Sequence, residues 1–367
     1  MDVQRLDRLV VEGYRSIRHL DLALRPMNVL IGANGSGKSN LLEVFDLLGA
    51  IHAKRLRLFA AQAGGAERML HWGRRVTPEM HLRLEAGRNG YDARLVADDV
   101  GGLYFSAEDC WGQGVLHARP FDLRLGIGNS ESTLADEAAG HPGAVAHWML
   151  TTLVSWRRFH FHDTSPAARV KQAQPLADRV ELARDGGNLG PFLWALKQKD
   201  AAAYLRIRDA VRLVAPFFDD FVLEPDDLNP ELLRLAWCHA DGEGRWGPEA
   251  LSDGTLRFMC LATLLLQPNP PSLVIIDEPE LGLHPAAIVQ LADLLRSTAS
   301  TAQVIVATQS VTLLNNLDVE DVIVAERHGG TSTFTQIDPT SIQSWLEDFA
   351  VGELWEKNIL GGRPAWT

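Results

Sequence analysis

Residues 32–39 read GANGSGKS, directly after the apolar run Val29–Ile31 and directly before a segment whose apolar residues recur at helical spacing. The eight residues match the pattern G-x-x-x-x-G-K-[ST] in full, in the strand-then-helix context that this pattern requires. Glycines in such a loop let successive backbone N–H groups surround phosphate oxygens, and the N-terminus of the following helix adds positive potential. We therefore predict a phosphate-binding P-loop that opens an α/β unit.

The P-loop supplies the first predicted site residues. Lys38 can reach the β- and γ-phosphates of a nucleoside triphosphate, and the Ser39 hydroxyl can ligate Mg²⁺. A chance Gly-rich turn would seldom match eight positions and both flanks, so we favour nucleotide binding. The predicted ATP-binding set from this loop is Asn34, Gly35, Ser36, Gly37, Lys38, Ser39 and Asn40.

A second motif ends an apolar strand in two acids. Residues 273–278 read LVIIDE. Asp277, at the carboxyl end of this strand, can hold Mg²⁺ through water, and Glu278 can polarise an attacking water. Acids are also common at solvated strand ends. In a chain that carries a P-loop, we favour the catalytic interpretation.

A third motif precedes a predicted helix. Residues 251–255 read LSDGT, and Ser252 with Gly254 at a helix N-terminus can bind phosphate. A plain N-cap by Ser252 or Asp253 explains the same residues. Taken alone, the motif favours the N-cap.

The remaining pattern predicts how these motifs are assembled. Short strands fill residues 10–31, an antiparallel meander fills 80–105, and residues 251–326 alternate helices with continuously apolar strands. That alternation is typical of a parallel sheet covered on both faces. The predicted fold class is α/β, a P-loop NTPase with a parallel core sheet flanked by helices, an antiparallel β lobe and an inserted helical region. We expect the first strand–helix unit and the last third to share one sheet.

Composition excludes several classes of protein. The 367 residues are 46% hydrophobic and 22% charged, with a formal net charge of −12. These are ordinary values for a folded domain and unlike those of a chain coated in basic charge. No apolar stretch reaches the ~18 residues of a membrane helix. Cys110, Cys238 and Cys260 form no C-x-x-C pair, so we expect isolated reduced thiols in a cytoplasmic protein.

The order of the motifs resembles that of the ABC-type ATPase heads of the SMC/RecF-like superfamily. The segments that carry this resemblance are GYRSI (13–17), the P-loop, LSDGT, LVIIDEPELGLHP (273–285) and VIVATQS (304–310). The ending GELWEKNILGGRP further resembles short prokaryotic predicted ATPases of this superfamily, without a coiled-coil arm or a Toprim domain. The resemblance implies a single ABC-type head over 1–367, comprising an N-terminal lobe (1–110), an inserted, mostly helical region (111–250) and a C-terminal lobe (251–367).

The resemblance also implies roles for particular residues. Ser252 and Gly254 would form a signature motif that meets the γ-phosphate held by a second protomer, and residues 281–285 would form a D-loop. Gln309 stands where the family usually has a switch His, so ATP hydrolysis is expected to be slow or to use Gln309 as the sensor. The implied site comprises the catalytic residues Glu278, Lys38 and Gln309, the metal ligands Ser39 and Asp277, the nucleotide contacts Arg15 and Ser16, and the cofactors ATP and Mg²⁺. Gln113 is one of several candidates for the Q-loop glutamine.

The motifs and the resemblance leave two functions of different class open. The first is an ATP-gated head-to-tail homodimer that acts as a switch on DNA in repair, maintenance or anti-phage defence. The second is a regulatory ATPase subunit that controls a partner effector or nuclease without binding DNA or a membrane. Basic clusters at 54–57, 74–75 and 157–158 could contact a phosphate backbone or could be solvated surface charge. The cluster of His160, His162 and Asp163 favours a polar strand edge over a metal site.

Overall fold

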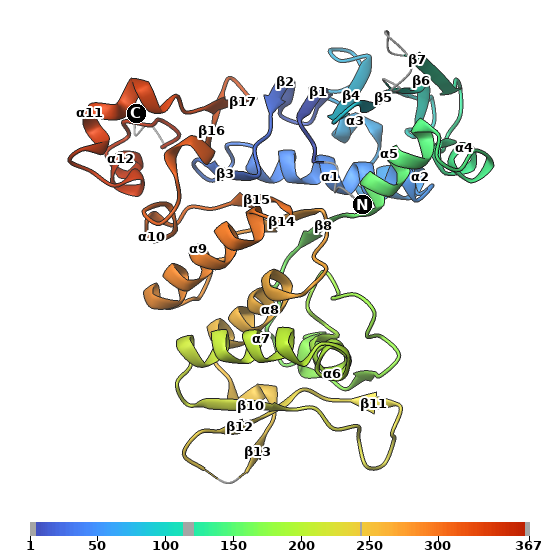
Figure 1. The fold of residues 1–367 in the computed structure, drawn as a ribbon. Helices are drawn as coiled ribbons and strands as arrows, with labels where there is room; N and C mark the ends of the chain where they lie inside the picture. Colours follow the sequence, from blue (N-terminus) through green and yellow to red (C-terminus); the bar gives the residue numbers. More distant parts are fainter. Residues whose placement is uncertain (1–4, 113–120, 243, 364–367) are drawn as a thin grey trace.

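A six-stranded core sheet collects strands from three distant parts of the sequence (Figure 1). The computed structural model describes residues 5–112, 121–242 and 244–363. The strand order is β17-β16-β3-β15-β14-β8, parallel throughout except for β17, which pairs antiparallel with β16. The strands are β3 (Met27–Ile31), β8 (Trp156–Phe159), β14 (Leu273–Asp277), β15 (Gln303–Ala307), β16 (Val322–His328) and β17 (Thr331–Gln336). The predicted sharing of one sheet is confirmed, and β8 joins it from the middle of the chain.

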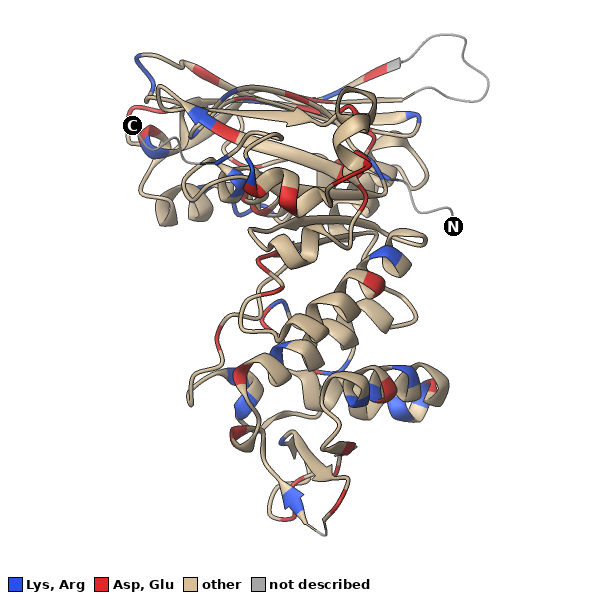
Figure 2. Ribbon diagram, turned by 90° about the vertical axis from the view of Figure 1, so that its left-hand side faces the viewer, with Lys and Arg blue, Asp and Glu red and all other residues tan. Residues whose placement is uncertain are grey.

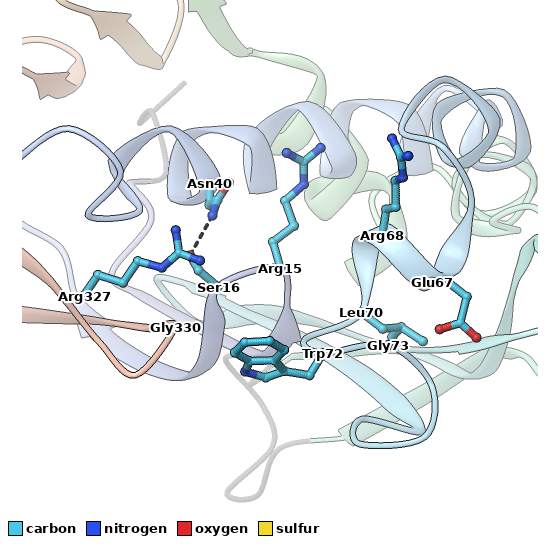
Figure 3. Close-up of a pocket in the computed structure, with 10 residues that line it drawn as sticks. All are labelled: Arg15, Ser16, Asn40, Glu67, Arg68, Leu70, Trp72, Gly73, Arg327 and Gly330. Atoms are coloured by element: carbon cyan, nitrogen blue, oxygen red, sulfur yellow. Dashed lines mark hydrogen bonds between the residues drawn. The ribbon is translucent and has the colours of Figure 1, made fainter.

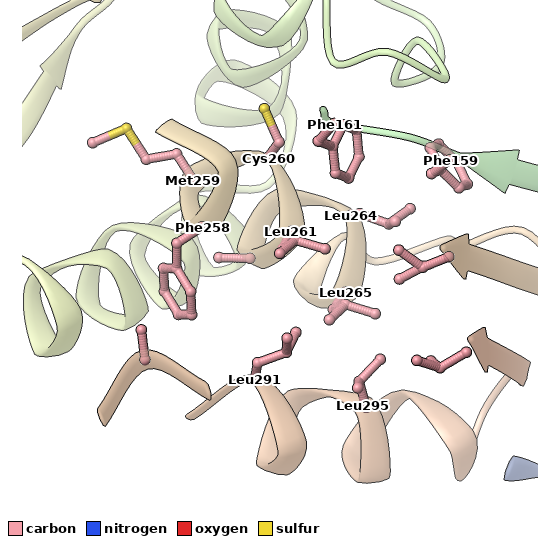
Figure 4. Packing of buried hydrophobic residues seen from close by; sticks show 14 of the residues in the cluster. Phe159, Phe161, Phe258, Met259, Cys260, Leu261, Leu264, Leu265, Leu291 and Leu295 are labelled. Carbon is pink, nitrogen blue, oxygen red and sulfur yellow. The ribbon is translucent and has the colours of Figure 1, made fainter. Parts of the chain in front are cut away.

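Helices cover both faces of this sheet. Successive strand residues point to opposite faces, so Val29 and Ile31 belong to one hydrophobic core and Leu30 belongs to the other. The helix after the P-loop packs on the Leu30 side, and two later helices pack on the Val29 side. These helices are α1 (Lys38–His52), α8 (Asp253–Leu266) and α9 (Pro285–Ala299). Figure 4 shows Leu261 and Leu265 of α8 facing Leu291 and Leu295 of α9.

The second six-stranded sheet is antiparallel and has the order β2-β1-β4-β5-β6-β7. Its strands are β1 (Arg8–Tyr14), β2 (Ile17–Ala23), β4 (Glu79–Ala86), β5 (Asn89–Ala97), β6 (Leu103–Gly112) and β7 (Phe121–Gly126). Along β4, buried residues alternate with half-buried ones, as expected for a sheet with one face on the core. The meander predicted over 80–105 is therefore present, with β1 and β2 added at one edge.

Residues 134–246 form helices, the core strand β8 and short antiparallel strands. Helices α6 and α7 lie in the lower half of Figure 1, above β10, β12 and β13. Helix α6 ends and α7 begins at Asp200, because the Asp200 carboxylate accepts the Ala203 N–H at 2.9 Å and caps α7. The elements are α4 (Leu134–Gly140), α5 (Val145–Val154), β9 (Gln174–Pro175), α6 (Leu189–Lys199), α7 (Ala201–Val214), β10 (Phe218–Val222), β11 (Leu232–Leu233), β12 (Ala236–His239) and β13 (Arg245–Trp246).

The described part of the chain has five further short α-helices. They are α2 (Leu56–Gln62), α3 (Ala66–Met69), α10 (Val311–Leu314), α11 (Gln343–Leu346) and α12 (Val351–Glu356). The segment after α12 returns to the P-loop, where the Gly362 carbonyl accepts the Ala33 N–H at 2.7 Å.

Within the described ranges, no helix is long and apolar enough to cross a membrane, and all three cysteines are free. In Figure 2, basic and acidic segments lie side by side along the ribbon.

Candidate nucleotide site

The P-loop connects β3 to α1, and its backbone conformation requires a glycine before the helix. Gly37 has φ 112°, and an added Cβ would lie 2.1 Å from the Ser332 hydroxyl oxygen of β17. A side chain at this position would meet both backbone strain and a collision. The loop therefore needs the glycine that the sequence motif supplies immediately before Lys38.

Lys38 folds back over the loop that precedes it. Its Nζ donates to the Gly32 carbonyl at 2.7 Å and to the Ala33 carbonyl at 3.1 Å, and the side chain is buried. Burial lowers the pKa of Lys38, and the nearby carboxylates of Glu278, Asp277 and Glu280 act in the opposite direction. Among the described residues this buried ammonium bonds only to carbonyls, and it is therefore suited to receive a multiply charged anion.

The predicted P-loop and strand-end residues surround one cavity of about 190 Å³. Its lining consists of Asn34, Gly35, Ser36, Gly37, Lys38, Ser39, Asn40, Asp277, Glu278, Gln309 and Arg327. The structure therefore brings together ten of the residues predicted from the sequence, which lie on three separate segments. Arg327, at the end of β16, was missed by sequence reasoning; its Nη1 donates to the Gly35 carbonyl at 3.3 Å.

Glu278 leaves the core sheet with a left-handed backbone. Its φ is 45°, a conformation that costs a non-glycine residue about 1–2 kcal/mol. The Glu278 N–H donates to the Ala307 carbonyl at 2.8 Å, and Gln309 Nε2 donates to Glu278 Oε1 at 2.9 Å. These two contacts hold the strained residue and direct its carboxylate into the cavity.

Asp277 has an unpredicted partner. Arg158 of β8 contacts Asp277 Oδ2 at 3.1 Å and Asp46 Oδ2 of α1 at 2.7 Å. His162, beyond the end of β8, bonds through Nε2 to the Asp277 carbonyl at 2.9 Å. The basic cluster at 157–158 therefore supplies a residue of the site, and no sequence signal distinguished Arg158 from its neighbours.

A buried carboxylate supports the same edge of the sheet. Glu280 Oε1 accepts the Thr308 hydroxyl at 2.6 Å and the Gln309 N–H at 3.2 Å, while its Oε2 is buried without a hydrogen-bond partner in the described part of the chain. Burial raises the pKa of Glu280, and the Thr308 hydrogen bond opposes that shift. Glu280 thus ties the segment after β14 to the segment after β15.

The LSDGT segment does not reach this cavity. Ser252 is exposed and caps α8 by accepting the Thr255 N–H at 3.1 Å, as the N-cap interpretation predicts. Gly254 packs directly on the segment predicted as the D-loop, because an added Cβ would lie 2.1 Å from the Gly282 carbonyl oxygen. Neither Ser252 nor Gly254 is among the described residues that line the cavity at Lys38.

Arg257 connects three segments near this motif. From α8 it donates to the carbonyls of Phe161 at 3.2 Å, His162 at 2.9 Å and Leu281 at 2.8 Å. The first two belong to the segment after β8 and the third belongs to the predicted D-loop. One guanidinium therefore joins α8 to both loops.

Arg15 and Ser16 occupy the turn between β1 and β2, beside the P-loop. The Ser16 hydroxyl accepts Asn40 Nδ2 at 2.6 Å and the Ser332 hydroxyl at 2.7 Å (Figure 3). Arg15 has φ 48° and pairs with Glu43 of α1 at 2.6 Å. Both residues line a second cavity that shares Asn40 with the first.

Two other expectations concern residues away from the cavity. Gln113, considered for the Q-loop, lies outside the described residues. Among the residues that are described, no group of three or more His, Cys, Asp or Glu side chains could hold a metal ion. The interpretation of His160, His162 and Asp163 as a polar edge stays a prediction, and His162 bonds to a backbone carbonyl.

The residues present fit a Mg²⁺–triphosphate group. The Ser36 hydroxyl is buried in the loop with no hydrogen-bond partner among the described residues, and Lys38 has no carboxylate partner within ion-pair distance there. A phosphate chain supplies acceptors for both groups. Ser39 and Asp277 line the same cavity, and a hydroxyl with a carboxylate is the oxygen donor set that Mg²⁺ prefers.

A parallel core sheet with a P-loop after β3, two acids at the end of β14 and an antiparallel second sheet together give a fold similar to that of solved SMC heads. A family model described as "AAA domain, putative AbiEii toxin, Type IV TA system" matches residues 27–79 and 122–315. This match covers more than half of the chain. The chain therefore belongs to that family of AAA domains.

Solved structures confirm the fold. The chain superimposes on an SMC head bound to the C-winged helix domain of ScpA with a TM-score of 0.57 at 16% identity, covering 92% of this chain and 99% of that one. A Pyrococcus furiosus-derived Smc head, with an extended coiled coil and the C-terminal domain of ScpA, gives 0.54 at 15% identity, covering 94% and 98%. At these identities the likeness establishes the fold.

Curated relatives are similar over a shorter stretch. The DNA replication and repair protein RecF of Cronobacter sakazakii is 38% identical over 93 residues, 25% of this chain and 22% of that protein. RecF of Salmonella arizonae is 47% identical over 102 residues, 26% of this chain and 25% of that protein. The matched stretch thus spans about a quarter of each relative.

Proposed function

We propose that this protein binds and hydrolyses ATP at the cavity around Lys38. The observation that carries the proposal is the convergence of Lys38, Asp277, Glu278 and Gln309 on one cavity from three segments of the chain. The P-loop N–H groups and Lys38 would hold the phosphates, and Ser39 with Asp277 would hold Mg²⁺, which neutralises charge on the phosphates when bound. Glu278 would orient the attacking water, and the hydrogen bond from Gln309 would hold the Glu278 carboxylate in place.

The proposed reaction uses two protomers. Ser252 and Gly254 lie at the exposed N-terminus of α8 and away from the cavity of their own chain. A helix N-terminus favours anions, so this end of α8 could meet the γ-phosphate held by a second copy. Under a two-fold axis the same two surfaces meet twice, and each dimer then holds two composite sites.

Light scattering tests the ATP-gated dimer. The mass of the Glu278→Gln protein, which should retain ATP, should double when ATP and Mg²⁺ are added. Ser252→Arg on that background should keep ATP binding and prevent the doubling, because a bulky cation would occupy the position that must approach the partner's phosphate. Asp200→Ala, which removes another helix cap, is the matched control and should not affect pairing. A mass that is independent of ATP in every variant contradicts ATP-gated pairing.

For the biological role we propose a nucleic-acid switch in repair, maintenance or anti-phage defence. The proposal is supported by the similarity to RecF, a replication and repair protein, and by the SMC-head fold. DNA-stimulated ATP hydrolysis that falls steeply with salt would support it, since phosphate contacts release counterions. Hydrolysis that is indifferent to DNA at low salt would exclude it.

A second candidate, control of a partner effector protein without DNA, is favoured by the ion pairs of the basic clusters. Lys54 pairs with Asp136 at 2.5 Å, and Arg74 pairs with Glu67 at 3.1 Å. Arg158 is engaged by acids of the site. Cations paired in this way contribute less to phosphate-backbone binding. An absence of DNA binding at low salt, together with intact ATP hydrolysis, would favour this candidate.

A further inference from the structure

A second cavity, of about 470 Å³, lies beside the P-loop (Figure 3). It is formed where the β1–β2 turn, the start of α1, the segment after α3 and the β16–β17 hairpin meet. Asn40 and Arg327 line both this cavity and the one around Lys38. A ligand whose phosphates occupy the P-loop could therefore extend past Asn40 into the second cavity.

Trp72 gives this cavity a large aromatic surface. The Trp72 side chain is 64% exposed, and its backbone adopts φ 59°, a rare conformation for a bulky residue. Two contacts hold this turn: the His71 N–H donates to the Gly13 carbonyl at 2.9 Å, and His71 Nδ1 lies 2.6 Å from the Arg15 carbonyl. A strained residue that presents an exposed indole at a cavity points to a use for the ring.

The indole is also held from the side of the β16–β17 hairpin. A Cβ added at Gly330 would lie 2.4 Å from Trp72 Cζ2, so only a glycine lets the hairpin approach the ring this closely. The hairpin supplies Arg327 as well. The ring is thus placed by two separate segments, while most of its surface remains open to a ligand.

Guanidinium groups surround the same space. Arg15, Arg68 and Arg327 all line the cavity, and Figure 3 shows Arg15 and Arg68 on the side of α1. Arg15 is neutralised by Glu43, whereas Arg68 has no carboxylate partner among the described residues. An exposed indole beside an unpaired cation suits a flat, electron-rich ring linked to a phosphate.

We propose that the second cavity binds the base and ribose of a nucleoside triphosphate, with the base stacked on Trp72. This inference rests on the proposed nucleotide binding at Lys38 and adds the residue that recognises the base. Stacking acts on the π face, which every base has, and grows with ring area. A purine nucleotide should therefore bind more tightly than a pyrimidine nucleotide.

Calorimetry with ATP and with inorganic tripolyphosphate, which lacks the base and ribose, distinguishes binding in the second cavity from binding in the cavity around Lys38. Trp72→Ala should weaken ATP binding about 10–100-fold, the range of one base–aromatic stack, and leave tripolyphosphate binding unchanged. Trp72→Phe should retain most of the affinity for ATP. Trp246→Ala, which removes a 50% exposed indole on β13, is the matched control and should change neither ligand.

The results distinguish this inference from the proposed function. If neither ligand binds the wild-type protein, the nucleotide-binding proposal fails and this inference fails with it. If both ligands bind and Trp72→Ala leaves their affinity ratio unchanged, only the role of Trp72 is overturned. An equal loss of both ligands also overturns it, because the substitution would then act on the P-loop itself.

Fluorescence gives a second measurement that does not depend on the alanine variant. ATP should quench part of the wild-type tryptophan emission, and tripolyphosphate should not. The same titration of Trp72→Phe should lose that quenching, whereas Trp246→Ala should keep it. Quenching by ATP that persists in a folded Trp72→Phe protein would overturn the stacking of the base on Trp72.

Discussion

The amide nitrogen of Gln309 donates to Glu278 Oε1 at 2.9 Å. The same nitrogen donates to Asn34 Oδ1 at 2.7 Å, so one side chain links the ends of β14 and β15 to the P-loop. An amide donates regardless of pH, whereas a histidine in this position would change its charge between pH 5 and 8. Gln309 therefore provides a fixed donor to the proposed catalytic carboxylate.

Replacing Gln309 tests this bridge. Gln309→Ala should leave ATP affinity nearly unchanged and lower turnover about 10–100-fold, since a hydrogen bond to a charged group contributes about 1.5–3 kcal/mol. Phosphate release and calorimetry measure the two quantities separately. Gln309→His should restore turnover with a new pH dependence between 5 and 8. Normal turnover in Gln309→Ala would show that hydrolysis does not use the bridge.

Lys38→Ala should abolish ATP binding. The substitution removes the buried ammonium that the P-loop holds over the cavity, and with it the charge that meets the β- and γ-phosphates. Calorimetry with Mg²⁺–ATP measures the loss. Lys199→Ala, at the exposed end of α6, is the control and should bind as the wild type does. Wild-type affinity in Lys38→Ala would falsify the assignment of the P-loop.

Glu278→Gln should bind ATP normally and hydrolyse it far more slowly. The carboxylate that orients the water is removed while Asp277 and Ser39 remain in the cavity. Loss of a positioned acid or base typically lowers the rate about 10²–10⁴-fold. Single-turnover hydrolysis after rapid mixing is the suitable measurement. Turnover at the wild-type rate would mean that Glu278 is structural.

Arg257→Ala should disconnect α8 from the loops after β8 and β14. Three carbonyls lose their guanidinium donor, and a loss of about 1–3 kcal/mol in the free energy of unfolding is expected. ATP affinity should remain, because Arg257 does not line the cavity, while turnover should fall. Chemical denaturation and phosphate release are measured together. In Arg257→Lys the side chain reaches fewer of these carbonyls, so its free energy of unfolding and its turnover should lie between those of the wild type and Arg257→Ala.

The pH dependence of stability tests the environment of Asp321. Burial, together with the neighbouring Asp318 and Glu320, raises the pKa of Asp321 to about 6. A carboxyl with a raised pKa in the folded state stabilises the protein below its unfolded pKa, and this stability is lost as the pH rises through about 6. Asp321→Asn should therefore raise the melting temperature more at pH 8 than at pH 4. Asp99→Asn, at a fully exposed carboxylate, is the control; equal shifts at both pH values would contradict the assignment.

The P-loop could be located from the sequence because its requirements are local. Eight consecutive residues set the turn, and the collision at Gly37 shows why the glycine is needed there. Asp277 at the end of β14 and Glu278 directly after it could also be predicted, since the carboxyl ends of parallel strands meet at one edge of a sheet. The helix break at Asp200 is equally local, because a short side chain caps the next helix.

Other contributors had no local signal. Arg158 lies on a short strand in the middle of the chain and reaches Asp277 only because β8 pairs with β14. Arg327 and Trp72 lie far from the P-loop in the sequence and reach it through the β16–β17 hairpin and the turn after α3. A lone Arg is ordinarily a solvated surface charge and a lone Trp is ordinarily part of a core, so neither residue type predicted a place in a site.

The sequence by itself determined the phosphate-binding loop, the α/β class, and the identity of the acids and the glutamine at the strand ends. The loop, the class and the acids depend on backbone geometry over a few residues or on a hydrophobic period, whereas Gln309 was identified through the resemblance to ABC-type ATPase heads. Tertiary structure decided which cations face Asp277, which segments adjoin the P-loop, and that Ser252 lies away from the cavity of its own chain. Those relationships depend on the pairing of strands far apart in the sequence, and no local pattern encodes that pairing.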